Sequence, residues 1–214
     1  MLDFTEKLEE YIECHIDAEP DNLKELYRYT HLHHLYPRMC SGHYQGRLLK
    51  MLTCMINPQR VLELGTYTGY SALSIAEGMN ESAHLDTIEL DEEKEAELHK
   101  RFENSPYAGR IHLHIGDALE VISRLPGPWD MVFIDANKRN YLEYLETVYA
   151  KIPLGGYVLA DNTLWDMKVI ENEQDMDGQT KAIAEFNDVM AHDKRFEKVI
   201  LLVRDGLTIM RRVI

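Results

Sequence analysis

The sequence predicts an α/β fold: one domain built on a seven-stranded, mostly parallel sheet, with helices on both faces and one antiparallel strand near the C-terminus. From residue 60 onward, short apolar runs alternate with helical patterns, which is typical of parallel strands joined by crossover helices. Near the end, Asp205-Gly206 separates two β-rich runs, which indicates a hairpin. At 214 residues the chain is long enough to bury such a sheet as a single domain, 1–214.

The elements are justified in chain order by apolar spacing and by their end signals. Apolar residues three and four apart predict a first helix over 3–17 with one buried stripe, and Asp21 is expected to cap a second helix over 22–35. A loop through Gly46 is expected to lead into a third helix. The remaining expected helices are 47–55, 70–79, 91–103, 118–124, 140–151 and 179–191, and the expected strands are 60–65, 84–90, 111–116, 131–135, 156–161, 199–203 and 207–210.

Composition excludes several classes of protein. The net charge of −14 argues against a broad phosphate-binding surface, hence against DNA, and against docking on an anionic membrane. The three cysteines lack a C-x-x-C spacing, so no disulfide framework or zinc knuckle is indicated. The acidic N-terminus and the absence of a long apolar run predict neither a signal peptide nor a membrane span. We therefore expect a cytoplasmic protein.

A glycine turn joins the first expected strand to its helix in RVLELGTYTGYSALSIA, between Gly65 and Gly69. Such a turn lets a ligand approach backbone N–H groups at a helix N-terminus. The next expected strand ends in Glu89, a position where a carboxylate binds ribose hydroxyls in nucleotide-type folds. An ordinary βα loop would explain the glycines alone. A nicotinamide-dependent oxidoreductase is disfavoured because the turn lacks G-x-G-x-x-G and has no glycine at Tyr67.

Acids also follow the fourth and fifth expected strands. If these strands are neighbours, Asp135 and the pair Asp161-Asn162 converge and offer two carboxylates and an amide carbonyl, a donor set that suits Mg²⁺ or a similar divalent cation. Lys138 is close enough in sequence to reach an oxygen held there. For either Asp alone, a helix cap is an equally good interpretation. The histidines His31, His33 and His34 invite a metal interpretation too, but neighbours in a helix do not share a face, so solvated histidines are favoured.

The ordered motifs VLELGTYTGYSALSIA, TIEL, FIDANKRNY, GGYVLADNTLW and LLVRDGLTIMRR resemble the S-adenosylmethionine-dependent, metal-dependent O-methyltransferases of the catechol and caffeoyl-CoA type, including bacterial members. The resemblance runs from about Met39 to the end. It implies a Rossmann-like methyltransferase domain that transfers a methyl group from S-adenosylmethionine to a hydroxyl of a small vicinal diol chelated by the cation. Residues 1–57 would form a cap and contribute to a homodimer, and residues 58–214 would form the cofactor-binding sheet.

The resemblance also implies roles for individual residues. Glu89 matches the acid on the ribose diol, and Lys138 matches a lysine proposed as the catalytic base, with Asp135 beside it. Met39, Ser41 and Gly46 match the loop over the methionine part of the methyl donor. The other matching positions are Glu63, Gly65, Tyr67 and Ser71 in the glycine turn, Gly116, Asp117 and Ala118 on the adenine side, and Asp135, Asp161 and Asn162 as metal ligands.

The acceptor stays open at this stage. Segments 1–36 and 166–179 are expected to select it, and the second is a candidate mobile lid, yet neither carries an aromatic pattern that matches a known acceptor pocket. A tRNA hydroxyuridine O-methyltransferase of the same family is the main alternative. The low number of cations favours a small molecule over RNA. A non-catalytic binding protein is less favoured, because cofactor and metal positions both match.

Overall fold

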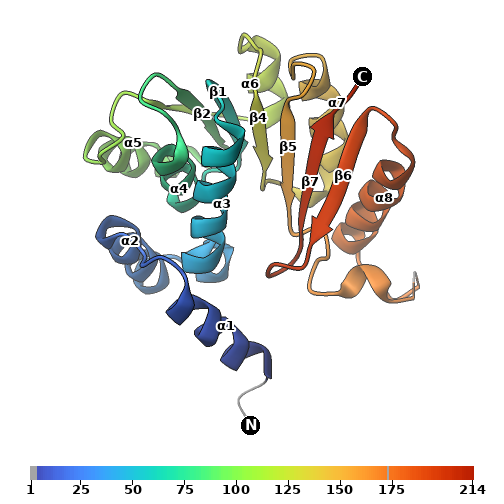
Figure 1. Ribbon diagram of the computed structural model, residues 1–214, viewed down its shortest axis with the longest axis horizontal. Helices are drawn as coiled ribbons and strands as arrows, with labels where there is room; N and C mark the ends of the chain where they lie inside the picture. The colour runs from blue at the N-terminus through green and yellow to red at the C-terminus, as the bar shows by residue number, and fades with distance from the viewer. Residues whose placement is uncertain (1–3, 173) are drawn as a thin grey trace.

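The computed structural model describes residues 4–172 and 174–214, and it confirms the predicted fold class (Figure 1). Within that part of the chain the seven strands form one sheet in the order β3-β2-β1-β4-β5-β7-β6. Strands β1 to β5 pair in parallel, and β7 runs antiparallel to both of its neighbours, β5 and β6. The antiparallel strand therefore lies inside the sheet, and β6 forms the edge.

The strands are short and the helices connect them in the expected alternation. The strands are β1 (Arg60–Leu64), β2 (His84–Glu89), β3 (Ile111–Ile115), β4 (Met131–Ile134), β5 (Tyr157–Asp161), β6 (Phe196–Leu201) and β7 (Leu207–Arg212). The α-helices are α1 (Phe4–His15), α2 (Asp21–His33), α3 (Gly42–Ile56), α4 (Tyr70–Gly78), α5 (Glu95–Glu103), α6 (Ala118–Arg124), α7 (Tyr141–Tyr149) and α8 (Gly178–His192). Short 3-10 turns stand at Pro37–Met39, Glu92–Lys94, Lys138–Asn140 and Lys168–Ile170.

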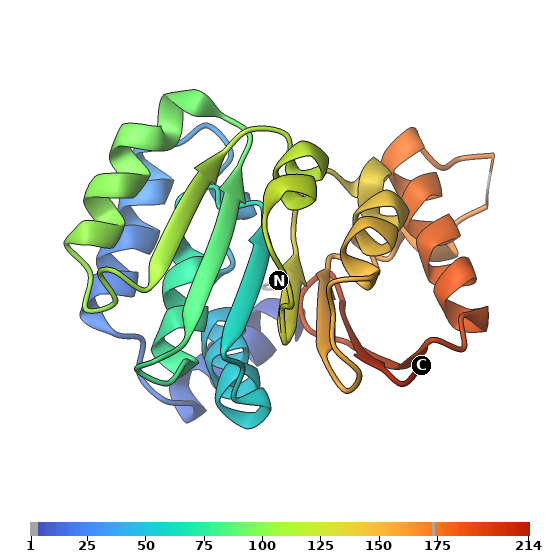
Figure 2. The same ribbon diagram turned by 90° about the horizontal axis from the view of Figure 1, so that it is seen from above.

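Two apolar cores lie on opposite faces of the sheet. One is formed by α6, α7 and α8 around Trp129, Tyr141 and Phe186, which are almost completely buried. The other is formed by α2, α3, α4 and α5 around Leu49, Leu73 and related residues. Figure 2 shows the two groups of helices on either side of the strands. Because both faces are covered, the carboxyl ends of the parallel strands are left as the accessible edge.

Several sequence predictions about helix ends are wrong, and α1 and α7 each stop two residues early, at His15 and Tyr149. Asp21 does not cap α2: it is the first helical residue after Pro20, and no side chain bonds that helix end. Helix α2 also stops at His33, two residues early, and α3 begins at Gly42 rather than at residue 47. The polar residues before Arg47 are helical because tertiary contacts bury Gln45 and Gly46. The helix expected from residue 91 starts as a 3-10 turn, and α5 itself begins at Glu95.

The expected buried stripe of the first helix is also wrong for this chain taken alone. Tyr11 is 61 % exposed, Leu8 is exposed, and Ile12 is only partly buried. Figure 1 shows α1 projecting from the body of the molecule, away from the sheet. None of the helices in the described part of the chain is long and apolar enough to cross a membrane.

Candidate active site

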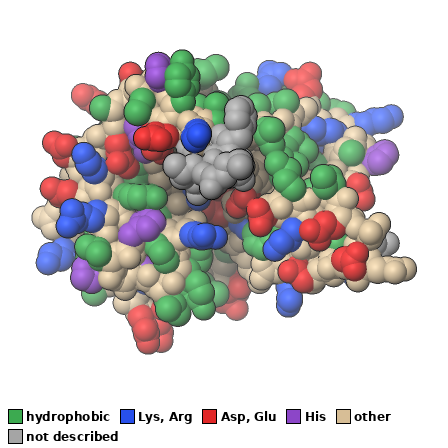
Figure 3. All heavy atoms as spheres, turned by 90° about the horizontal axis from the view of Figure 1, so that it is seen from below, with side chains coloured by type: hydrophobic (Ala, Val, Ile, Leu, Met, Phe, Trp, Pro, Cys, Tyr) green, Lys and Arg blue, Asp and Glu red, His purple; other side chains and the backbone are tan. Residues whose placement is uncertain are grey.

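A cavity of about 1370 Å³ opens at the carboxyl ends of the parallel strands. Figure 3 looks onto this edge of the molecule and shows acidic side chains in the hollow. Of the residues predicted from the sequence, those that line the cavity are Met39, Ser41, Gly65, Tyr67, Ser71, Glu89, Gly116, Asp117, Ala118, Asp135, Lys138, Asp161 and Asn162. Positions spread over more than half of the chain therefore meet in one space. Two predicted positions, Glu63 and Gly46, lie behind its wall.

The glycine turn needs glycine for two different reasons. Gly65 has φ +97°, and a Cβ atom there would lie 2.1 Å from the carbonyl oxygen of Asp135. Gly69 has φ +84° and is the N-cap residue of α4, and no side chain of the described residues caps that helix end. The first N–H groups of α4 are therefore free to face a ligand, as backbone donors at a helix N-terminus do.

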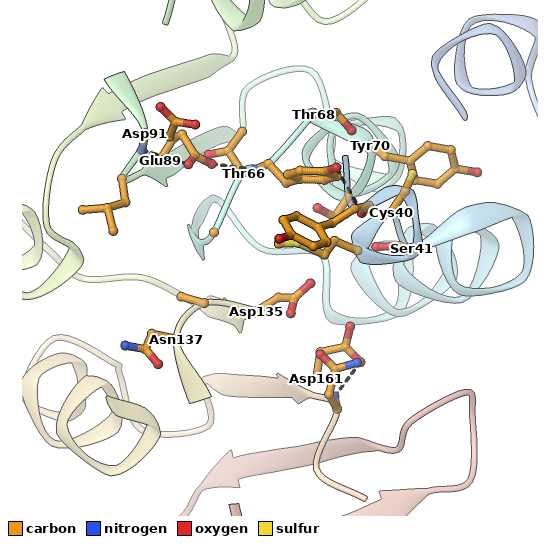
Figure 4. A pocket seen from close by; sticks show the side chains of 18 of the residues that line it. Cys40, Ser41, Thr66, Thr68, Tyr70, Glu89, Asp91, Asp135, Asn137 and Asp161 are labelled. Atoms are coloured by element: carbon orange, nitrogen blue, oxygen red, sulfur yellow. Dashed lines mark hydrogen bonds between the residues drawn. The ribbon is translucent and has the colours of Figure 1, made fainter. Parts of the chain in front are cut away.

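Glu89 is fixed by the backbone around it. Its two carboxylate oxygens accept hydrogen bonds from the backbone N–H groups of Tyr67 (2.7 Å) and Asp91 (3.0 Å). The side chain is 7 % exposed. Figure 4 shows Glu89 and Asp91 at one end of the pocket and Asp161 toward the other. A carboxylate held in this way keeps lone pairs for hydroxyl donors of a ligand.

Glu63 lies in the middle of β1 and is completely buried. The Thr87 hydroxyl donates to its Oε2 at 2.5 Å, whereas Oε1 is buried with no hydrogen-bond partner in the described part of the chain. Burial raises the pKa of Glu63 to about 8, although the nearby hydroxyl groups of Ser71 and Thr87 lower it. Ser71 lines the cavity, so Glu63 sits one side chain behind the wall. An unpaired buried carboxyl oxygen marks a place where a donor group is missing.

Asp117 has a structural task as well as a place in the cavity wall. Its Oδ1 accepts from the backbone N–H groups of Leu119 and Glu120 and caps α6. In the described part of the chain neither Asp135 nor Asp161 caps a helix: Asn137 caps the 3-10 turn after β4, and Met167 is the N-cap residue of the 3-10 turn after β5. The helix-cap interpretation therefore applies to Asp117 and not to the two acids expected to hold a metal.

Asp135 and Asp161 leave the sheet side by side. Strands β4 and β5 are neighbours, and Ile134 pairs with Ala160, so the next residue of each strand is the acid. Lys138 donates to Asp135 Oδ1 at 2.7 Å and to the Tyr141 hydroxyl at 2.7 Å. Burial lowers the pKa of Lys138, but the charges of Asp135, Tyr141 and Asp161 and the hydrogen bond to Asp135 together outweigh burial and raise that pKa above its usual value. Lys138 is thus a buried ammonium group.

Burial also raises the pKa of Asp161, and the charge of Asp135 raises it further. Its Oδ1 accepts from the backbone N–H of Asn162 at 2.8 Å, and its Oδ2 accepts from the side chain of Gln45 at 2.5 Å. Asn162 has φ +55°, a left-handed conformation that Asn adopts more readily than most residues. This turns the chain sharply after β5, directly at the cavity wall.

The donor atoms here fit a hard divalent cation. Two carboxylates and an amide offer oxygen ligands, and the two acids repel each other in a buried place where, among the described residues, Lys138 is the ammonium group that faces them. Each oxygen of Asp161 accepts one hydrogen bond and retains a second lone pair. A bound cation would relieve the repulsion between the two acids and would be coordinated by the free lone pairs.

Sequence reasoning missed three residues of the site. Gln45 and Arg204 contact each other and the site from distant parts of the chain. Trp165 lines the cavity with its ring 5.9 Å from Lys138 Nζ, and its own Nε1 is buried without a hydrogen-bond partner among the described residues. Trp165 is the last residue of the motif GGYVLADNTLW, so the sequence could have indicated it. The motif LLVRDGLTIMRR likewise contained Arg204, whereas no local pattern points to Gln45.

The three neighbouring histidines make separate contacts. His31 lies against the Tyr27 ring, His33 lies against Tyr29, and His34 lies against Tyr67 at the rim of the cavity. Within the described residues no group of three or more potential metal-binding His, Cys, Asp or Glu side chains is found. His34 is the only one of the three that lines the cavity.

Comparisons with known proteins agree with this geometry. Residues 13–213 match the family model described as O-methyltransferase. The chain is 31% identical to caffeoyl-CoA O-methyltransferase 5 of Nicotiana tabacum, over 91% of this chain and 85% of that protein. It is 33% identical to caffeoyl-CoA O-methyltransferase 1 of Zea mays, over 91% and 80%. The crystal structure of the SAH-bound methyltransferase PaMTH1 of Podospora anserina is 27% identical, covers 99% of this chain and 96% of its own, and superposes with a TM-score of 0.91.

Proposed function

The chain belongs to the O-methyltransferase family and is an S-adenosylmethionine-dependent O-methyltransferase acting on small hydroxylated molecules, and on this premise we propose that its acceptor is a catechol-like vicinal diol held by a divalent cation. The observation that carries the proposal is the meeting of Asp135, Asp161 and Asn162 with the glycine turn in one cavity. The open helix end suits the methyl donor, and the oxygen cluster suits two adjacent acceptor oxygens.

We assign the methyl donor to the half of the cavity formed by β1, β2 and β3. Glu89, with both oxygens fixed by backbone N–H groups, would accept from the ribose hydroxyls. Ser71, which lines the cavity, would lie at the amino acid end of the donor, with the buried Glu63 one side chain behind it. Gly116, Asp117 and Ala118 would line the adenine, and the 39–41 loop would cover the methionine part.

We assign the cation and the acceptor to the half formed by β4 and β5. Asp135, Asp161 and Asn162 would hold Mg²⁺ or a similar ion, whose Lewis acidity lowers the pKa of a hydroxyl group bound to it. Lys138 carries its proton here, so of the two roles expected for it we favour stabilising the negative charge that develops on the acceptor oxygen. Asp135 positions the Lys138 ammonium group through its 2.7 Å hydrogen bond.

Methyl transfer from a sulfonium to an oxyanion neutralises charge, so much of the rate comes from alignment of the two reactants. The backbone supplies that alignment, because Gly65 and Asp135 lie in contact at the ends of adjacent strands β1 and β4. The donor turn and the acceptor acids are thereby held at a fixed separation.

Electrostatics favours a small acceptor over tRNA. RNA binding depends on many phosphate contacts, and the chain carries 23 Lys and Arg against 37 Asp and Glu. On the face that bears the cavity, basic side chains are scattered among acidic ones (Figure 3). Of the cations near the site, Lys138 is bonded to Asp135, and farther away Arg211 is paired with Glu197 at 3.4 Å. Of the other cations that line the cavity, Lys94 is paired with Asp91 and Arg204 is bonded to carbonyl oxygens, which leaves Arg38 for an RNA backbone among the described lining residues.

One experiment tests the acceptor. The protein is incubated with Mg²⁺ and methyl-labelled S-adenosylmethionine, with either a panel of catechols or tRNA lacking the modification, and the transferred label is counted. We expect label on a catechol that disappears after exhaustive chelation of metal. Label confined to tRNA would establish the hydroxyuridine alternative, and full turnover after chelation would remove the cation from the proposal.

We further propose that the protein is a cytoplasmic homodimer that uses the exposed apolar side chains of α1 and α2. Tyr11 in α1 and Leu32 in α2 are 61 % and 66 % exposed. In a monomer these apolar side chains remain in contact with water, whereas a dimer interface would bury them. Sedimentation at micromolar concentration tests the proposal, and we expect a dimer that dissociates when Tyr11 and Leu32 are replaced by Ser. A wild-type monomer would refute it.

A further inference from the structure

Gln45 is a buried amide placed between the end of the sheet and the β6–β7 turn. It lies in the first turns of α3 and is 2 % exposed. Its Nε2 donates to Asp161 Oδ2 at 2.5 Å, and its Oε1 accepts from Arg204 Nη1 at 3.0 Å. Both ends of the amide are therefore paired, over sequence separations of 116 and 159 residues.

The two partners fix which way the amide points. A carboxylate offers only acceptors and a guanidinium offers only donors, so the amide nitrogen must face Asp161 and the oxygen must face Arg204. With the amide turned over, an oxygen would face an oxygen at the acid and a donor would face a donor at the arginine. Arg204 thus determines, through Gln45, that a hydrogen-bond donor is presented to Asp161.

Arg204 has a second set of contacts with residues 38–41, a part of the cavity wall that we call the roof segment. Its guanidinium donates to the carbonyl oxygens of Cys40 (3.0 Å), Ser41 and Arg38 (3.3 Å). These residues form the segment 38–41 that leads into α3, and all of them line the cavity. Arg204 itself stands in the β6–β7 turn with φ +47°. One guanidinium therefore joins the roof segment, the amide of Gln45 and the hairpin.

We propose that Gln45 and Arg204 are positioning residues: Gln45 orients the Asp161 carboxylate for a divalent cation, and Arg204 fixes the Gln45 amide and pins the roof segment 38–41 over the methyl donor. The proposal rests on the cation site of the proposed function. Neither residue touches the reacting atoms. Hydrogen bonds of this kind behind a metal ligand typically change metal affinity about 10–100-fold when removed.

The two residues are expected to act differently. Loss of Gln45 leaves one oxygen of Asp161 without its donor, but the roof segment keeps its three bonds to Arg204. Loss of the Arg204 fork releases both the roof segment and the Gln45 oxygen. The first change is therefore expected to weaken cation binding alone, and the second to weaken binding of both the cation and the methyl donor.

The test measures binding without turnover. Mn²⁺ alone is titrated and the free ion is followed by electron paramagnetic resonance, and S-adenosylhomocysteine is titrated by calorimetry. The variants are Gln45→Met, which keeps the length of the side chain and removes both hydrogen bonds, and Arg204→Lys, which keeps the charge and removes the fork. The matched control is Thr53→Val, because Thr53 is a buried residue of α3 whose hydroxyl bonds only Leu49 O and the sulfur of Met131. Thermal unfolding is recorded for each.

We expect Gln45→Met to weaken Mn²⁺ binding about tenfold or more, with S-adenosylhomocysteine bound nearly as in the wild type. Arg204→Lys should weaken both, and Thr53→Val neither. Equal Mn²⁺ affinity in Gln45→Met and the wild type would overturn the role of Gln45. Unchanged affinities in Arg204→Lys would overturn that of Arg204, and this variant carries the test if Gln45→Met does not fold. A wild type that binds no Mn²⁺ would instead refute the proposed cation site, and with it the inference.

Discussion

The two halves of the cavity are constructed differently. On the side of β1 and β2, backbone geometry sets the site: Gly65 and Gly69 shape the turn, and backbone N–H groups fix Glu89. On the side of β4 and β5, charged side chains hold one another, as Lys138 holds Asp135. A site made by the backbone keeps its shape when one side chain changes, whereas a network of buried charges depends on every member. Single substitutions should therefore affect the two halves very unequally.

The largest effect is expected from Asp161→Ala. The change removes a carboxylate in which both oxygens are hydrogen-bonded, and with it one of the two charges offered to a cation. We expect turnover to vanish while S-adenosylhomocysteine still binds, as measured by labelled-methyl transfer and calorimetry. The comparison of the two halves fails if donor binding is lost together with activity in a variant that is folded.

Lys138→Ala is expected to come next. The ammonium group contributes mainly where charge develops during transfer, so kcat should fall by about 10²–10³-fold, the usual cost of one such stabilising group, with little change in acceptor KM. Steady-state kinetics with the acceptor found in the labelling experiment measure how the loss divides between kcat and KM. A rise in KM at constant kcat would instead assign Lys138 to acceptor binding.

On the donor side, Glu89→Ala should weaken S-adenosylhomocysteine binding by about 1–3 kcal/mol, the cost of leaving hydrogen-bonding groups unpaired. Its backbone partners, the N–H groups of Tyr67 and Asp91, remain in place, so the turn should persist. Calorimetry gives the affinity, and Glu93→Ala, a cavity-lining acid with no such bonds among those described, is a matched control. Equal affinity in Glu89→Ala and the wild type would exclude Glu89 from the ribose site.

The smallest effect concerns the pH dependence of stability through Glu63. Burial raises its pKa to about 8 in the folded protein from 4.5 in the unfolded chain. Between these values the unfolded chain releases the proton and the folded protein keeps it, so the free energy of unfolding contributed by this group falls as pH rises. Thermal unfolding of the ligand-free protein between pH 5 and pH 8 should therefore depend less on pH in Glu63→Gln than in the wild type. An identical slope in both proteins would contradict the assignment.

How much the sequence predicts also differs between local and long-range features. The strand, glycine turn and helix from Arg60 onward are encoded by neighbouring residues, and so is the pairing of Asp135 with Lys138 three residues later. The early start of α3 was not predictable, because the polar Gln45 becomes helical and buried only through partners at Asp161 and Arg204. The prediction that the apolar stripe of α1 is buried in this chain failed for a related reason. Apolar spacing shows which face of a helix is apolar, but it does not identify the surface that covers this face.

The contact between Gly65 and Asp135 has a consequence for how such a protein can diverge. The backbones of Gly65 and Asp135 lie directly against each other, so the separation between the glycine turn and this acid is set by the adjacent strands β1 and β4. The parts of the cavity wall outside the strand ends, namely residues 34–41, Trp165 and Gln179, are attached to this frame from outside. Replacing them changes which molecules enter without changing where a methyl group meets an oxygen. The same arrangement of strands can in this way serve different acceptors, because a change of acceptor needs only a change in the segments around the cavity entrance.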